Sequence, residues 1–174
     1  MRSFIIGLIA GIVVVVAGVY IYFAMGWAPV ATADAEMPFE MTLAHMAMHA
    51  RIARDMRSQQ APPLPADEPN LTAGAHVYRD HCAACHGLNG QPKPEIAGGE
   101  APAPPQFFHG EGVTDDPPGE TYWKARNGIR LTGMPAFGKS LNDRQLWQVS
   151  LLLAHADKLP SSVQKLLAEP APGH

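Results

Sequence analysis

Two cysteines and a histidine form the group of residues with the most specific chemistry in this sequence. Cys82 and Cys85 are separated by two residues, and His86 follows the second cysteine directly. This spacing is typical of covalent c-type haem attachment, in which both thiols add to the vinyl groups of one haem and the imidazole binds its iron. The run therefore predicts one covalent haem c, with His86 as an axial ligand of the iron.

Other roles of a Cys-x-x-Cys pair fit this sequence less well. A structural disulfide, half of a zinc site and a thioredoxin-like redox pair all use the same spacing. Cys82 and Cys85 are the only cysteines, so no second pair completes a zinc tetrad. No strand-rich pattern of the thioredoxin type surrounds them. We therefore favour haem, and we expect packing around the porphyrin, rather than disulfides, to hold the fold.

Met134 is the candidate for the second axial ligand. The sequence has eight methionines, and Met134 is the only one in the part of the chain that could surround the haem. It lies between Gly133 and Pro135, which favour an extended loop that could place the thioether over the iron. Histidine and methionine together would fill both axial positions. A methionine that only packs on the porphyrin remains the alternative.

Helical patterns stand on both sides of these residues. Residues 71–84 predict a helix that starts near Asn70 or Thr72 and leads into the cysteines. Residues 119–127 predict a short helix, which Gly128 would close.

A third helix is predicted after a capping box, Asn142-Asp143-Arg144-Gln145. It carries an apolar face that includes Trp147 and ends before Leu159-Pro160. The first and last of the three helices could cross, with Gly74 permitting the close approach and facing Trp147.

These motifs together resemble the monohaem class I cytochromes c. The resemblance implies an all-α fold of three to five helices around one haem, with His86 and Met134 as axial ligands and crossed terminal helices. It also implies a proline carbonyl against the imidazole of His86, for which the sequence offers five prolines without distinguishing them. The residues that carry the resemblance are Gly74, Tyr78, Cys82 to Gly87, Asn127 to Ile129, Thr132 to Phe137 and Trp147, and the five prolines are Pro92, Pro94, Pro102, Pro104 and Pro105.

The N-terminal part of the chain predicts a membrane anchor. Residues 4–25 contain no charged residue and are long enough to cross a hydrocarbon core as one helix. Arg2 precedes this run, whereas Asp34 and Glu36 follow it, which places the rest of the chain outside the cytoplasm. A cleaved secretory signal with a site near Ala33 is the competing interpretation, but the apolar run is longer than a signal core. We expect a single-pass protein of the inner membrane with a periplasmic haem domain.

Residues 37–60 predict an amphipathic helix beside the membrane. Met41, His45, Met48 and His49 recur at helical spacing, so they share one face. Paired imidazoles with thioether neighbours could hold copper. Alternatively, this face packs against a partner subunit or the haem domain, which is the more common role of methionine stripes and the interpretation we favour.

The remaining boundaries follow from proline content. Residues 61–69 are Pro-rich and predict a semi-rigid linker that holds the haem domain away from the membrane. Residues 161–174 predict a disordered tail. The expected organisation is an anchor with its flank (1–36), the Met/His helix (37–60), the linker (61–69), the cytochrome c domain (70–160) and the tail (161–174).

The net charge of the chain and the coordination of the iron limit the classes of function that fit this sequence. Thirteen basic and 16 acidic residues give a net charge of −3, which argues against a nucleic-acid partner. An iron with two protein ligands predicts electron transfer rather than an enzyme of its own. The expected partners are the membrane and redox proteins of a respiratory chain, such as an oxidase, a reductase, a dehydrogenase or a quinol-oxidising complex. A fixed haem subunit of a periplasmic dehydrogenase and a ligand-binding haem sensor are the alternatives.

Overall fold

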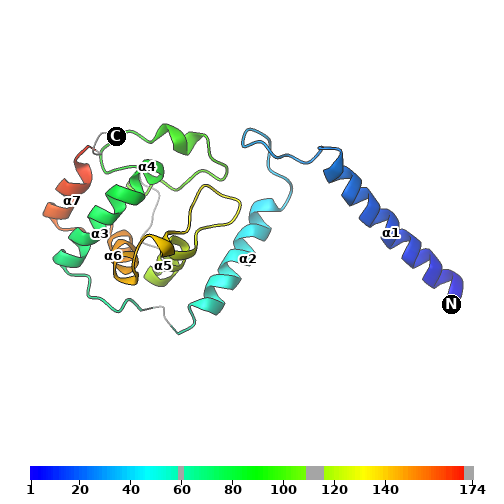
Figure 1. Cartoon of the computed structure of the whole chain (residues 1–174), viewed down its shortest axis with the longest axis horizontal. Helices are drawn as coiled ribbons and strands as arrows, with labels where there is room; N and C mark the ends of the chain where they lie inside the picture. Colours follow the sequence, from blue (N-terminus) through cyan, green and yellow to red (C-terminus); the bar gives the residue numbers. More distant parts are fainter. Residues whose placement is uncertain (59–60, 109–115, 171–174) are drawn as a thin grey trace. The chain divides into compact units, whose positions relative to one another are not determined.

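The computed structural model describes residues 1–58, 61–108 and 116–170 (Figure 1). All regular elements in these ranges are helices, which confirms the predicted all-α class. The chain divides into two compact units, Met1–Leu43 and Ala44–His174.

The first unit contains helix α1 (Arg2–Ala24), which could cross a membrane by its length and composition. It has 23 residues, its 18-residue apolar window has a mean hydropathy of 2.8, and none of its side chains is buried within the protein. At 1.5 Å per residue, such a helix is about 35 Å long, enough for a hydrocarbon core of about 30 Å. This helix is therefore a candidate membrane anchor.

The second unit is built on helices that pack around one apolar core. Helix α3 packs against α6 and α7, and α5 packs against α6 (Figure 1). The short helix α4 continues α3 after a break at Cys82, and two short 3-10 helices, η1 and η2, lie in the connecting loops. The bounds are α3 (Glu68–His81), α4 (Ala83–His86), η1 (Glu95–Gly98), α5 (Pro118–Asn127), η2 (Phe137–Lys139), α6 (Asp143–Ala154) and α7 (Ser161–Ala168).

Helix α3 begins earlier than Asn70 or Thr72, because Asp67 caps it. The carboxylate of Asp67 accepts a hydrogen bond from the backbone N–H of Asn70 at 3.0 Å. Asn70 instead joins two helices, since its side-chain oxygen accepts from Nε2 of Gln148 on α6 at 3.1 Å. The capping box predicted at Asn142 and Gln145 is present at the start of α6.

The crossing of α3 and α6 occurs at Gly74, but Gln148 and Leu152, rather than Trp147, make the closest contacts. A Cβ atom at Gly74 would lie 2.7 Å from the carbonyl carbon of Gln148 and 3.2 Å from Cβ of Leu152. Trp147 points toward α5, where its ring stacks on Tyr122 with the centroids 4.3 Å apart. Only glycine at position 74 permits this approach of the two backbones.

Helix α2 (Glu40–Asp55) lies within the segment 37–60 that predicts a helix, and its later residues belong to the second unit. Ile52 and Met56 are each 5% exposed and belong to the same core as α3 and α6. Nε1 of Trp123 on α5 donates to the carboxylate of Asp55 at 3.1 Å. The end of α2 is therefore part of the domain that holds the cysteines.

This packing corrects the expected role of residues 61–69. The segments on both sides of them, α2 and α3, contribute to one core, so residues 61–69 join two helices of a single unit. They are therefore not a spacer between two separate parts of the chain. Proline content predicts an extended backbone here, but it does not tell whether the flanking elements pack together.

The expected disordered tail is also wrong for most of its length. Residues 161–168 form α7, in which Val163 and Leu167 are fully buried against α3. Arg79 on α3 also pairs with Glu169 at 3.1 Å. Spacing of i and i+4 places the two apolar side chains on one helix face, and this burial stabilises the segment despite its flanking prolines. The domain therefore extends beyond residue 160, and residues 171–174 lie outside the described residues.

Candidate functional site

The break between α3 and α4 presents the two cysteines on one turn of backbone. The backbone N–H of Cys82 still bonds to Tyr78, and that of His86 bonds to the carbonyl of Cys82 at 2.9 Å. Neither cysteine forms a disulfide. Burial raises the pKa of Cys82 to about 12, and it also raises the pKa of Cys85, which lies beside Glu100. This environment favours uncharged sulfur, as in a thioether to haem.

His86 is buried, and its ring has a defined orientation. Its Nδ1–H donates to the carbonyl oxygen of Pro105 at 2.9 Å. Of the five prolines that the sequence leaves undistinguished, the structure thus selects Pro105. Burial lowers the pKa of His86, although the bond to Pro105 and the charge of Glu100 act in the opposite direction. The ring is held in its neutral form with Nε2 available for a metal, as in histidine ligands generally.

Aromatic side chains complete the surroundings of His86. The ring of Phe107 stacks on the imidazole with the centroids 4.5 Å apart and an interplanar angle of 7°. The hydroxyl of Tyr78 donates to the carbonyl of Gly87 at 2.7 Å, and its ring meets Phe108 edge to face. The residues next to His86 in sequence and in space are therefore fixed by several independent contacts.

Met134 lies in a loop that begins at Gly128, directly after α5. The backbone N–H of Met134 donates to the hydroxyl of Thr132 at 3.1 Å, and this hydroxyl donates to the carbonyl of Ile129 at 2.7 Å. Gly128 has a φ of +67°, and a Cβ atom there would lie 2.8 Å from the carbonyl oxygen of Met134. The half-buried Met134 side chain packs against the core. Glycine is therefore required where the loop folds back on the end of α5.

The carboxylate of Glu100 lies against both halves of the site. Its Oε1 is 3.8 Å from the Sγ of Cys85. On the other side, a Cβ atom at Gly133 would lie 2.6 Å from its carboxyl carbon. The structure therefore brings the cysteine turn and the loop that carries Met134 to one place. Two uncharged thiols, an oriented neutral imidazole and a thioether form a donor set that fits a c-type haem.

The methionine and histidine residues of α2 have different surroundings in the structure. His49 points toward α5, with Nδ1 3.4 Å from the carboxylate of Glu120, and the ring centroids of His45 and His49 are 6.2 Å apart. Met48 packs against the core, whereas Met41 belongs to the first unit. Among the described residues, no three or more His, Cys, Asp or Glu side chains are grouped as a metal site. For Met48 the structure shows packing on its own domain, and copper binding at the histidines stays a prediction.

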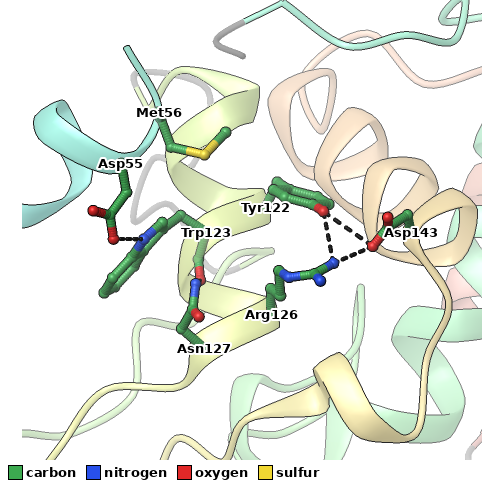
Figure 2. Close-up of a pocket in the computed structure, with 7 residues that line it drawn as sticks. All are labelled: Asp55, Met56, Tyr122, Trp123, Arg126, Asn127 and Asp143. Atoms are coloured by element: carbon green, nitrogen blue, oxygen red, sulfur yellow. Dashed lines mark hydrogen bonds and ion pairs between the residues drawn. The ribbon is translucent and has the colours of Figure 1, made fainter. Parts of the chain in front are cut away.

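A polar pocket of about 310 Å³ lies where α2, α5 and α6 meet (Figure 2). Arg126 pairs with Asp143 and donates to the hydroxyl of Tyr122 at 2.9 Å, and Trp123 is bonded to Asp55. These charged groups are therefore engaged with each other. The lining residues are Asp55, Met56, Tyr122, Trp123, Arg126, Asn127 and Asp143.

Several residues of the site were not identifiable from the sequence alone. Glu100, Gln106 and Phe107 lie in a long connection without helical or strand periodicity, and their contacts depend on how this connection folds over α4. The only available signal was the group of prolines, which marks an irregular segment without assigning a contact to any residue.

One comparison with known proteins gave a match. Residues 69–151 match the family model described as cytochrome C oxidase, cbb3-type, subunit III. The matched segment contains the cysteine turn, His86 and Met134, whereas α1, α2 and α7 lie outside it. Neither the search of curated proteins nor the search of solved structures gave a match.

Proposed function

We propose that this protein passes single electrons between components of a respiratory chain. The proposal rests on residues 69–151, which form a monohaem class I c-type cytochrome domain that binds one covalent haem c. The bound haem would supply the redox chemistry, because its iron alternates between the ferrous and ferric states. The protein's own part is to hold this group, to fill the axial positions and to exclude other ligands.

Four side chains would hold the haem. Cys82 and Cys85 would form the thioethers, and His86 and Met134 would bind the iron through Nε2 and sulfur. The observation that carries this proposal is the convergence of the cysteine turn and the Met134 loop on Glu100, with Nδ1 of His86 already bonded to Pro105. If His86 and Met134 both bind the iron, the haem would exchange electrons, and neither residue would leave room for a substrate. Methionine as the second ligand also favours a high reduction potential.

The partner would be a membrane complex on the periplasmic side of the inner membrane. Helix α1 supports membrane attachment through its length and hydropathy. The description of the matched family supports association with a terminal oxidase. A reductase, a dehydrogenase or a quinol-oxidising complex could serve as the other redox partner. The protein would then be a tethered carrier or a fixed haem subunit, and not an enzyme alone.

Carbon monoxide tests the coordination directly. The ferric protein should show the iron–sulfur charge-transfer band, and the ferrous protein should not bind carbon monoxide readily. The variant Met134→Ala should lose the band and bind carbon monoxide while retaining its covalent haem. Rapid binding by the unaltered protein would contradict electron transfer as the sole function and would favour a haem sensor.

Gentle detergent extraction of native membranes tests the partner. After separation by size, haem staining and mass spectrometry would identify the proteins that migrate with this cytochrome. Co-migration with a terminal oxidase in a fixed ratio would identify a built-in subunit, and migration alone with full haem content would identify a tethered carrier. Co-migration with proteins unrelated to electron transfer would contradict a respiratory role.

A further inference from the structure

Residues 105–107 contact His86 or the cysteine turn at three successive positions. The carbonyl of Pro105 accepts from Nδ1 of His86 at 2.9 Å, and the ring of Phe107 stacks on the same imidazole at 4.5 Å. Between them, the side chain of Gln106 is only 3% exposed. Its position between two residues that touch the imidazole raises the question of what a buried amide does there.

Gln106 connects this segment to the cysteine turn. Its Nε2 donates to the carbonyl of Cys85 at 2.9 Å and to the carbonyl of Pro104 at 3.1 Å. One amide group thus joins the residue immediately before His86 to the residue immediately before Pro105. These bonds fix the distance between the backbone that carries the imidazole and the carbonyl of Pro105 that accepts its hydrogen bond.

We propose that Gln106 is a positioning residue for His86, which sets the hydrogen bond from Nδ1 to Pro105 and through it the reduction potential of the haem. This inference rests on the proposed role of His86 as an axial ligand. A strong hydrogen bond from Nδ1 makes the imidazole more electron-rich, which stabilises the ferric iron. Weakening this bond should therefore raise the reduction potential.

The test replaces the amide while keeping its volume. Gln106→Met retains a side chain of similar shape but cannot donate. We expect the Nδ1 proton of His86 to exchange with solvent about fivefold to thirtyfold faster, as the loss of one to two buried hydrogen bonds suggests. We also expect a higher reduction potential in a redox titration of the full-length haem protein.

Gln148→Met is the matched control. Gln148 is also a buried glutamine, 7% exposed, and its Nε2 donates to Asn70 at 3.1 Å. It lies at the crossing of α3 and α6 and makes its bond to α3. The control should lower the free energy of unfolding without changing proton exchange at His86 or the reduction potential.

Two results would overturn the proposal. Unchanged exchange and potential in Gln106→Met would show that the amide has no influence on the ligand. Equal changes in Gln106→Met and Gln148→Met would show a general loosening of the fold. If Gln106→Met does not incorporate haem, Gln106→Leu also removes the amide donor with a smaller apolar side chain, and the same readouts apply.

The experiment also separates this proposal from the proposed function. In the ferric protein, the ring protons of an axial histidine are strongly shifted by the iron in nuclear magnetic resonance spectra. Normal positions for the His86 ring protons would contradict its role as a ligand. The exchange rate of its Nδ1 proton would still report on the effect of Gln106.

Discussion

The two segments that carry the proposed axial ligands are held in different ways. His86 is buried on a helical turn, and its surroundings are fixed by Pro105, Gln106, Phe107 and Tyr78, which come from two separate parts of the chain. Met134 is half-buried in a loop, and in the part of the chain that the structure describes the hydrogen bonds of residues 129–134 join these residues to one another.

This difference indicates which ligand would leave the iron first. Displacing His86 would require breaking contacts that belong to the core, and the proposed thioethers at Cys82 and Cys85 would keep its backbone close to the iron. Displacing Met134 would require breaking its packing on the core and opening one loop, and such a local opening costs less free energy than global unfolding. We therefore expect small structural changes to displace Met134 from the iron more readily than His86.

The largest effect is expected for Gly128→Ala. A Cβ atom at this position would lie 2.8 Å from backbone atoms of Met134, Pro135 and Ala136, and the φ of +67° adds about 1–2 kcal/mol of strain. The loop should move, so the ferric protein should lose its iron–sulfur band and the ferrous protein should bind carbon monoxide.

Gly90→Ala is the matched control for this variant. Gly90 has a φ of +72°, but a Cβ atom there would meet nothing within 4 Å. It should cost similar strain and keep the iron–sulfur band. Loss of the band in both variants would mean that backbone strain, and not the contact with the Met134 loop, displaces the ligand.

A substitution near His86 should lower the free energy of unfolding but leave both iron ligands in place. Tyr78→Phe removes a fully buried hydroxyl and leaves the carbonyl of Gly87 without its donor, which costs about 1–3 kcal/mol. Denaturant unfolding should show this loss while the iron–sulfur band persists in the folded protein. If the band disappeared before unfolding, the proposed difference between the two sides would be wrong.

The smallest effect is expected for Thr132→Val. This variant removes the hydroxyl that accepts from Met134 and donates to Ile129, with a net cost of about 1 kcal/mol. Added imidazole should displace Met134 at about fivefold lower concentration, as measured by optical titration. Thr132→Ser keeps the hydroxyl and should behave as the unaltered protein, and an equal shift in both variants would exclude the hydrogen bonds as the cause.

Much of the fold could be predicted from the sequence because its signals are local. The capping box at Asn142 and the glycine after residue 127 mark helix ends through nearby residues. The contacts of Pro105 and Gln106 could not be predicted, because they depend on how an aperiodic connection folds over α4. The partner of Gly74 was misassigned by one residue, to Trp147 instead of Gln148, because apolar bulk does not reveal which residue's backbone lies closest at a crossing.

The packing of α2 on the domain changes how far an anchored cytochrome could travel. Because α2 and α3 contribute to one core, the proline-rich residues 61–69 add nothing to the length of the connection, and residues 25–39 alone join α1 to α2. A segment of this length reaches at most about 50 Å when fully extended. Confinement to so small a volume raises the local concentration toward the millimolar range for any acceptor embedded in the same bilayer nearby. A freely diffusing acceptor would gain nothing from it, so the short connection favours electron exchange between neighbours in one membrane.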